Sequence, residues 1–284
     1  MNILITGANG QLGCELRVVM NSTQHRYCFT DIEELDISDN HAVEAYVAGN
    51  NTDVIINCAA YTNVDGAEDN WHLADLLNNK AVKNMAKVAR KAGTTLIHIS
   101  TDYVLGGDVN IPYKENQPTN PLGVYGRTKL DGELGIQEVD CNYIIIRTSW
   151  LYSKFGNNFV KTIRKLISER DQLNVVFDQT GTPTYAADLA MAINYIINTG
   201  QLSKKGIYNF SNEGACSWYD FAMEIAALSG NKCDIQPCYS KEFPGKVKRP
   251  DYSVLDKTKI KNTFNITIPH WKESLVRCID ELNK

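Results

Sequence analysis

The 284-residue sequence has no long hydrophobic run. No apolar stretch approaches the roughly 18 residues that a membrane-spanning helix needs. The first residues pass directly into an apolar segment, residues 2–6, without the basic region and cleavage site of a secretion signal. We therefore expect no membrane partner and a cytoplasmic location.

The sequence also lacks paired cysteines. None of its eight cysteines forms a Cys-x-x-Cys pair, and none of its five histidines stands at zinc-finger spacing from a cysteine. In the expected compartment such cysteines stay reduced and act as small apolar side chains. This spacing argues against both a disulfide framework and a structural zinc site.

An excess of positive charge is missing as well. The formal net charge is -4, whereas a protein that binds nucleic acid without specificity usually carries a basic face. The sequence shows no internal repeat, low-complexity tract or flexible linker. We expect one large or two modest globular domains and no nucleic-acid partner.

A glycine-rich turn follows the first apolar segment. Its sequence is Gly7-Ala-Asn-Gly-Gln-Leu-Gly13, and a helical pattern continues from it. A strand, a glycine loop and a helix in this order form the phosphate cradle of dinucleotide-binding α/β folds, with the pyrophosphate at the helix N-terminus. We predict cofactor contacts from Gly7, Asn9, Gly10, Gln11 and Leu12. The alternative is a glycine-rich turn that binds no ligand.

Further cofactor contacts are predicted where the next strands end. Asp31 closes a strand over residues 27–30 and follows Gly13 by 18 residues, close to the spacing at which an acid accepts the adenosine ribose hydroxyl. Its carboxylate would repel the extra phosphate of NADPH and so favours NADH, unless Asp31 is only a solvated strand-end residue. The contacts expected beside the adenine and against the flat cofactor rings are Asp36, Ile37, Cys58, Ala59 and Ala60.

Strand and helix patterns alternate through the first half of the chain. Short connections in a βαβαβαβαβ order predict an α/β fold, a doubly wound (Rossmann) parallel sheet with right-handed crossovers. We predict a dinucleotide-binding domain over residues 1–150 and a smaller, mainly substrate-binding domain over residues 151–284. A helix over residues 186–199 is expected to pack back on the sheet. One long helix is expected over residues 67–92, and another beginning near Pro121.

Tyr125 and Lys129 lie four residues apart on that second helix, so both side chains face the same way. A lysine beside a tyrosine favours the phenolate and makes the hydroxyl a better proton donor and acceptor. Thr101 is predicted at the carboxyl end of the preceding strand, where open parallel sheets bind their ligands. Beside a dinucleotide, these groups predict hydride transfer between an alcohol and a carbonyl compound.

Several longer motifs extend this pattern along the chain. They are GANGQLG (7–13), NCAAYTNVD (57–65), STDYV (100–104), PLGVYGRTK (121–129), RTSWLY (147–152), GNNF (156–159), GTPT (181–184) and Arg249-Pro250. Together they resemble the extended short-chain dehydrogenase/reductase family, within it the enzymes that reduce nucleotide-linked sugars. The resemblance covers most of the chain and weakens after about residue 205.

The resemblance implies reduction of a sugar C4 carbonyl with NADPH or NADH, and a small-molecule nucleotide-sugar substrate. It implies Thr101, Tyr125 and Lys129 as the catalytic residues, with Tyr125 and Lys129 also contacting the cofactor. The substrate contacts that it implies come from Tyr103, Trp150, Asn157, Asn158 and Arg249. Arg249 is expected near the diphosphate, because a guanidinium can bind phosphate oxygens bidentately. The alternatives are a core aromatic for Trp150 and a surface charge for Arg249.

Some bacterial members of this family form homodimers through a magnesium ion held by acidic side chains. Glu15 stands in a suitable first-helix position, but the later segment supplies only Asp188. A hard cation needs several oxygen ligands, so we do not expect Mg²⁺, and Glu15 is then a solvated residue favoured by the helix dipole.

Two other functions fit the same motifs. One is a related sugar-nucleotide epimerase or dehydratase, although a dehydratase adds an acidic pair after the strand-end threonine and this chain has Asp102 followed by Tyr103. The other is a non-catalytic, cofactor-binding regulatory subunit, such as the β subunit of methionine adenosyltransferase, which resembles this family.

Overall fold

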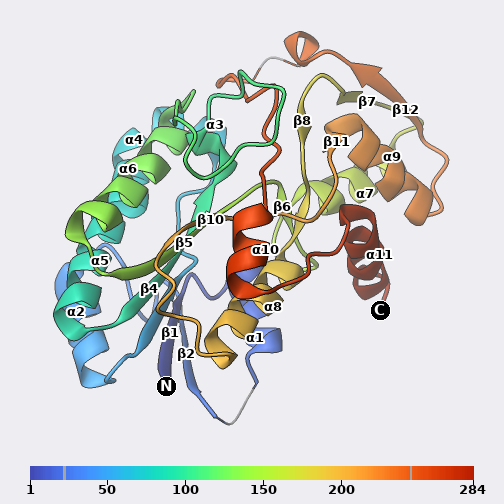
Figure 1. Ribbon diagram of the computed structural model, residues 1–284. Coiled ribbons are helices and arrows are strands. Elements are labelled where there is room, and N and C mark those ends of the chain that lie inside the picture. Colours follow the sequence, from blue (N-terminus) through green and yellow to red (C-terminus); the bar gives the residue numbers. More distant parts are fainter. Residues whose placement is uncertain (22–23, 244) are drawn as a thin grey trace.

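Six strands form one parallel sheet at the centre of the protein (Figure 1). The computed structural model describes residues 1–21, 24–243 and 245–284. The strand order is β10-β5-β4-β3-β1-β2, and every neighbouring pair is parallel. The strands are β1 (Asn2–Thr6), β2 (Arg26–Thr30), β3 (Val54–Asn57), β4 (Thr95–Thr101), β5 (Asn142–Thr148) and β10 (Gly206–Asn209). This arrangement confirms the predicted doubly wound α/β fold.

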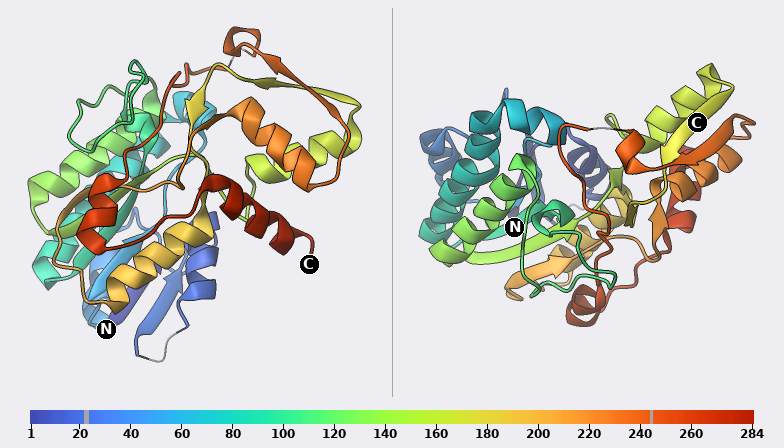
Figure 2. Two further views of the ribbon diagram at one scale, coloured as in Figure 1. Left: turned by 45° about the vertical axis from the view of Figure 1, so that its right-hand side comes forward. Right: turned by 90° about the horizontal axis from the view of Figure 1, so that it is seen from above.

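Helices cover both faces of the sheet (Figure 2), which explains why its strands are continuous apolar runs. On one face lie α1 (Gln11–Val19), α8 (Ala186–Asn198) and α10 (Thr258–Phe264). On the other face lie α2 (Asn40–Gly49), α5 (Ala81–Ala92) and α6 (Val124–Val139). The helix α8 packs against α1 and the sheet.

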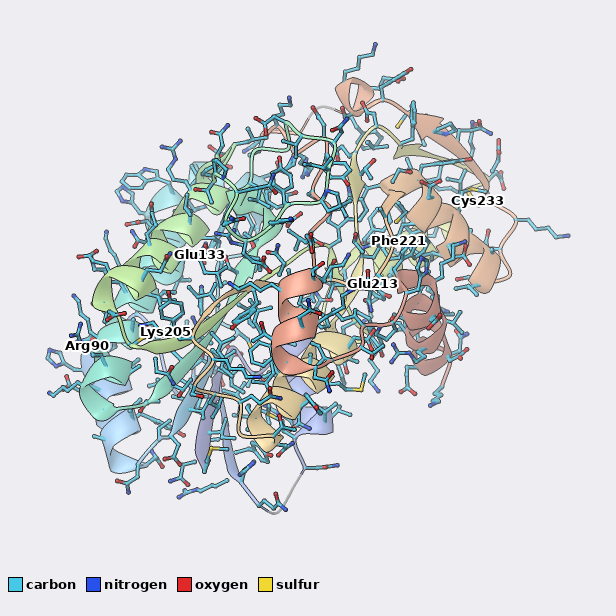
Figure 3. The ribbon with its side chains drawn as sticks, viewed as in Figure 1. Arg90, Glu133, Lys205, Glu213, Phe221 and Cys233 are labelled. Atoms are coloured by element: carbon cyan, nitrogen blue, oxygen red, sulfur yellow. The ribbon has the colours of Figure 1, made fainter. Side chains whose placement is uncertain are left out.

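A second hydrophobic core lies in the later part of the chain, around the fully buried Phe221 (Figure 3). Its helices are α7 (Phe159–Glu169), α9 (Trp218–Leu228) and α11 (Trp271–Leu282). They pack with the parallel pair of β7 (Gln172–Val176) and β12 (Asp234–Cys238). Two short ladders complete this part: β6 (Leu151–Tyr152) with β9 (Thr184–Tyr185), and β8 (Thr180–Gly181) with β11 (Cys216–Ser217). A 3-10 turn, η3 (Ser240–Glu242), follows β12.

The chain passes between the two cores more than once. The elements α8, β10 and α10 all follow residue 150, yet they pack with the sheet and its helices. The division at residue 150 remains a prediction.

Two helices differ from the sequence expectation. The single helix expected over residues 67–92 is four pieces: α3 (Val64–Asp69), α4 (Trp71–Asp75), a π-helical turn η1 (Leu76–Lys80) and α5. The break falls at Asn70, whose side chain donates to the Gly66 carbonyl at 3.1 Å and so ends α3. The helix α6 begins at Val124 rather than near Pro121, because Gly123 is extended and Glu68 of α3 accepts a hydrogen bond from the Val124 amide.

All eight cysteines are free thiols in the described chain. No helix within the described residues is both long enough and apolar enough to cross a membrane.

Candidate active site

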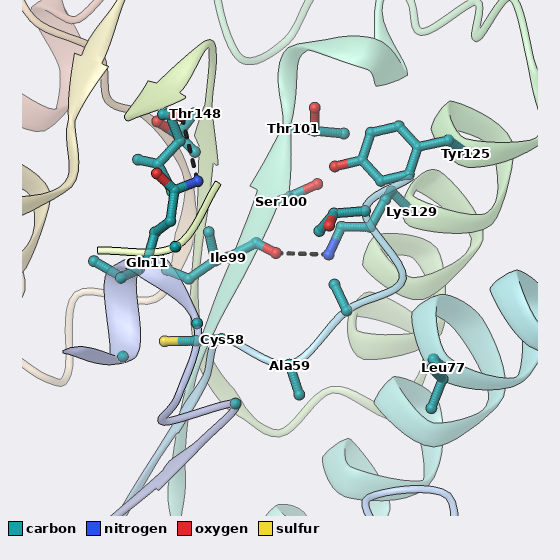
Figure 4. Close-up of a pocket in the computed structure, with 18 of the residues that line it drawn as sticks. Gln11, Cys58, Ala59, Leu77, Ile99, Ser100, Thr101, Tyr125, Lys129 and Thr148 are labelled. Atoms are coloured by element: carbon teal, nitrogen blue, oxygen red, sulfur yellow. Dashed lines mark hydrogen bonds between the residues drawn. The ribbon is translucent and has the colours of Figure 1, made fainter. Parts of the chain in front are cut away.

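A cavity of about 750 Å³ opens at the carboxyl ends of β1, β3 and β4 (Figure 4). The neighbours of β1 lead in opposite directions along the sheet, so this is the switch point at which doubly wound folds bind ligands. The volume lies in the range of ligand sites. Most predicted contact residues line it: Gly7, Gly10, Gln11, Leu12, Asp31, Asp36, Ile37, Cys58, Ala59, Ala60, Thr101, Tyr103, Tyr125, Lys129, Trp150, Asn157 and Asn158. Asn9 and Arg249 stand outside this lining.

The glycine turn leaves backbone, not side chains, at the floor of the cavity. Gly7 has a φ of +65°, and a Cβ there would lie 2.6 Å from the Ala59 amide nitrogen. A Cβ on Gly13 would lie 2.5 Å from the Ala8 Cα, which keeps α1 tight against the turn. At Gly10 the nearest atom to a Cβ is the Gly7 carbonyl oxygen, at 3.2 Å. The space beside Gly10 therefore fits a phosphate group approaching the helix N-terminus.

Asp31 extends this cradle at the end of β2. Its Oδ2 accepts a hydrogen bond from the Asn9 amide at 2.9 Å, and its Oδ1 accepts one from Ile32. Asn9 thus acts on the cavity through its backbone, by holding Asp31 against the glycine turn. The Asp31 side chain borders the cavity, where a ribose hydroxyl could reach it.

Tyr125 and Lys129 both face the cavity from α6 (Figure 4). The Tyr125 phenol points towards the end of β4, where Ser100 and Thr101 lie. Lys129 is only 2% exposed, and its Nζ donates to the Ile99 carbonyl at 2.7 Å. Thr101 is fixed by two bonds: its Oγ1 accepts from the Tyr103 amide at 3.2 Å and donates to Asp102 Oδ1 at 3.1 Å.

Burial shifts the pKa of both residues of this pair towards the neutral form. It raises the pKa of Tyr125 to about 12, although the neighbouring Thr101 hydroxyl opposes the shift. It lowers the pKa of Lys129 to about 8, against the opposing charge of Glu133. The expectation that Lys129 lowers the pKa of Tyr125 is not met in this structure, because burial is the largest influence on the phenol and raises its pKa.

A buried ion pair supports α6 directly behind Lys129. Arg147 on β5 binds Glu133 through Nε at 3.0 Å and through a terminal nitrogen at 2.7 Å. The Ser100 hydroxyl donates to the same carboxylate at 2.5 Å, and both charged side chains are at most 3% exposed. The sequence patterns predicted no role in the site for Glu133 or Arg147. Glu133 could have been noticed, since it continues the four-residue spacing of Tyr125 and Lys129 on one helix face.

The predicted substrate residues lie around the rim. Trp150 stacks on Trp218 with ring centroids 3.5 Å apart and planes 9° apart, so it is both a cavity wall and the edge of the second core. Asn158 caps α7 and donates to Gln11 Oε1 at 3.0 Å, while Asn157 lines the cavity beside it.

Tyr103 packs edge-on against Tyr125, with ring centroids 5.5 Å apart. Burial raises the pKa of Tyr103, and the nearby Arg249 opposes that shift, so Arg249 reaches this rim although it lies outside the cavity lining. Its guanidinium forms an ion pair with Asp65 at 2.9 Å.

The acidic residues considered for magnesium make other contacts within the described chain. No group of three or more His, Cys, Asp or Glu side chains within the described ranges is arranged to hold an ion. Glu15 was expected to be a solvated residue, and this expectation is wrong. The side chain is 2% exposed and accepts a hydrogen bond from Ser153 at 2.6 Å. Asp188 is occupied by Arg277, Ser274 and Asn212.

A parallel sheet with a glycine turn at its switch point, and a Tyr-x-x-x-Lys helix beside it, defines a dinucleotide-binding Rossmann protein of the short-chain dehydrogenase/reductase type. The family comparison is more specific. The family model described as RmlD substrate binding domain matches residues 1–284. The chain belongs to this family.

Relatives match the chain over nearly its full length. The dTDP-4-dehydrorhamnose reductase of Aggregatibacter actinomycetemcomitans is 39% identical over 283 residues, with 96% of each chain covered. A solved dTDP-4-dehydrorhamnose reductase from Clostridium acetobutylicum is 42% identical, with a TM-score of 0.96 and both chains fully covered. Another, from Bacillus anthracis in complex with NADP, is 40% identical, with a TM-score of 0.95 and 99% of each chain covered.

Proposed function

We propose that the protein reduces the C4 carbonyl of dTDP-4-dehydro-6-deoxy-L-mannose to dTDP-L-rhamnose, with NADPH or NADH as the hydride donor. The observation that carries this proposal is the meeting of Thr101, Tyr125 and Lys129 with the glycine turn in one cavity. Full-length similarity to proteins named dTDP-4-dehydrorhamnose reductase supports the choice of sugar and nucleotide.

Each residue of the site has a distinct role in this reaction. Tyr125 donates its phenolic proton to the C4 oxygen as that oxygen becomes an alcohol, and its high pKa keeps the proton in place until then. The Thr101 hydroxyl bonds to the same oxygen and fixes its distance from the phenol. Lys129 supplies positive charge beside the phenolate that remains and binds the cofactor ribose.

The chain also fits the cofactor. The backbone at Gly7, Gly10 and Gln11 would hold the pyrophosphate, Asp31 the adenosine ribose, and the small side chains of Cys58 and Ala59 the flat rings. A bound nicotinamide cofactor supplies the hydride, and the protein supplies orientation and the proton. The NADP complex of the Bacillus anthracis relative supports NADPH.

Asp31 makes the choice between the two cofactors testable. Replacing Asp31 with Ala removes the charge that disfavours the adenosine phosphate of NADPH. We expect the ratio of KM for NADPH to KM for NADH to fall about ten-fold, the effect of about 1.4 kcal/mol. An unchanged ratio would mean that Asp31 does not contact this part of the cofactor.

The second core is proposed to hold the nucleotide end of the substrate. Trp150 and the Asn157–Asn158 turn connect that core to the cavity, and Arg249 lies beside Tyr103 at its rim. The assignment of residues 151–284 as mainly substrate-binding, the homodimer and the cytoplasmic location remain predictions.

The direct test is to follow NADPH oxidation with dTDP-4-dehydro-6-deoxy-L-mannose. We expect turnover, and we expect Tyr125→Phe to lose about 10²–10⁴-fold in kcat, because only the proton donor is removed. NADPH binding to the variant serves as the control and should be nearly unchanged.

Two results would reject this proposal. Wild-type turnover by Tyr125→Phe would exclude the phenol as the acid. No turnover by the wild-type protein, combined with tight binding of a partner protein, would favour the regulatory subunit.

A further inference from the structure

A chain of buried polar side chains crosses the sheet and ends at Lys129. It runs from Thr6 at the end of β1, through Asn57 of β3 and His98 of β4, to the Lys129 Nζ on α6. All four residues are at most 2% exposed. The reaction proposed above assigns no task to Thr6, Asn57 or His98, and buried polar groups at these positions are costly unless they are paired.

The bonds of Asn57 determine which way its amide points. The Oδ1 atom accepts a hydrogen bond from the Thr6 hydroxyl at 2.7 Å and one from the Ala59 backbone amide at 3.2 Å. A backbone N–H can only donate, so the atom facing it must be the amide oxygen. The Asn57 Nδ2 group therefore faces His98 and donates to its Nδ1 at 3.1 Å.

This orientation determines the tautomer of His98. Burial and the charge of Lys129 lower the pKa of His98 well below its ordinary value, so the ring is neutral. A neutral imidazole with an accepting Nδ1 carries its only ring proton on Nε2. That Nε2 atom lies 3.4 Å from Lys129 Nζ, so an N–H group is directed at the lysine nitrogen.

An N–H group in this position acts differently on the two charge states of Lys129. The ammonium has only donors, and its bond to the Ile99 carbonyl at 2.7 Å uses one of them. The neutral amine has a lone pair that can accept the Nε2 proton. We propose that His98 is a positioning residue for Lys129: it anchors Nζ beside Tyr125 and stabilises the neutral amine relative to the ammonium, so that Lys129 is charged at neutral pH but loses its proton more readily than an ordinary lysine. This inference rests on the proposed function for the role of Lys129, but the contact itself does not.

The other ionisable groups around Lys129 do not replace this effect. Cys58, after β3, is a neutral thiol because burial raises its pKa to about 12. Glu133, on α6, favours the ammonium, but its carboxylate is paired with Arg147. His98 is therefore the neighbour on β4 that opposes the charge on Lys129. It acts in the same direction as burial, which by itself lowers the pKa of Lys129 to about 8.

The first test uses the wild-type protein and needs no substrate. NMR of ¹⁵N-labelled histidine and of lysine labelled at Cε reports the His98 tautomer and the titration of Lys129. We expect the His98 proton on Nε2 throughout the pH range in which the protein is folded, and a Lys129 titration near the value of about 8. A proton on Nδ1, or a Lys129 that titrates like an ordinary lysine at about 10.4, would overturn the proposal.

The second test compares two variants of similar size. His98→Gln keeps an N–H donor near the position of Nε2, whereas His98→Met fills the space without one. In His98→Met we expect the Lys129 titration, and with it the alkaline limb of the kcat/KM profile, to move up by about one pH unit, a ten-fold change in the equilibrium. His98→Gln should stay close to wild type in both measurements.

Equal shifts in both variants, or none, would leave His98 with a packing role and reject the proposal. If the wild-type protein turned over no substrate, the proposed function would fail while the NMR result still stood. The two ideas can therefore fail separately.

Discussion

Three ionisable side chains lie at the end of β4 and on the facing helix: two are at most 2% exposed, Lys129 and Asp102, and the third, Tyr125, is partly buried. Tyr125, Lys129 and Asp102 each shift towards the neutral form because burial penalises the charged one. Such groups are common in active sites, where they destabilise the fold but serve the chemistry.

Asp102 allows this cost to be measured. It is 1% exposed, and burial raises its pKa from 3.8 to about 6, against the opposing hydroxyls of Ser253 and Thr101. A carboxyl group whose pKa is raised on folding contributes most stability below its unfolded pKa, and that contribution is lost as the pH rises through about 6. Wild-type protein at pH 8 therefore carries an unfavourable buried carboxylate.

We predict that Asp102→Asn raises the free energy of unfolding at pH 8 by up to about 3 kcal/mol, from about 1.36 kcal/mol per unit of pKa shift. The gain should vanish below about pH 4, where both side chains are neutral. Urea unfolding at several pH values measures both. A variant that is less stable at pH 8 would show that the carboxylate makes favourable bonds that outweigh its burial.

At the scale of a single element, α6 lies unusually close to its neighbours. A Cβ on Gly126 would lie 2.2 Å from the Tyr103 carbonyl oxygen, and one on Gly132 would lie 2.2 Å from that of Asn78. Glycines thus allow the helix to approach the end of β4, and the Glu133–Arg147 pair connects it to β5. The positions of Tyr125 and Lys129 depend on this helix as a rigid body.

We predict that Glu133→Gln lowers the free energy of unfolding by about 3–5 kcal/mol, because the buried Arg147 loses its counter-charge. Replacing both partners, as in Glu133→Met with Arg147→Met, should cost much less, since no unpaired charge remains. Denaturant unfolding of the two proteins measures the difference. A single variant as stable as the double one would contradict this account.

Some features of helix α6 could be predicted from the sequence, and others could not. The four-residue spacing of Tyr125 and Lys129 predicted a shared helix face, because it depends only on local geometry. Arg147, as the partner of Glu133, could not be predicted, because it lies on the next strand and the pair is formed by tertiary packing. The break at Asn70 was missed because its side chain competes for the backbone within an otherwise continuous helical pattern.

At the scale of the whole molecule, the parallel sheet could be predicted from the sequence, because its strands are continuous apolar runs between short connections. The second core was harder to predict from the sequence. Its strand β12 contains Pro237 and pairs with β7 across a long stretch of intervening chain. Nothing local to residues 206–209 indicates that strand β10 borders β5.

Two ion pairs connect helix α3 to the loop that precedes Tyr252. Asp65 and Asp69, both on α3, bind Arg249 and Lys246 respectively. These side chains are at least one-third exposed, so each pair contributes at most about 1 kcal/mol. Arg249 can therefore leave Asp65 for a diphosphate at little cost.

If Arg249 exchanges Asp65 for the diphosphate, the affinity for the nucleotide sugar should depend on Arg249, and the affinity for the cofactor should not. Without its guanidinium, a charge-assisted bond of about 1.5–3 kcal/mol to the diphosphate is lost, equal to about a 10–150-fold weaker Kd for dTDP-L-rhamnose. Calorimetric titration of Arg249→Ala measures that loss, while its Kd for NADPH should stay near wild type. Lys248→Ala is the matched control: it removes one positive charge from the same loop at a side chain that is 71% exposed. Equal weakening in both variants would mean that the loop attracts the substrate only through its general charge, and that Arg249 does not contact the diphosphate.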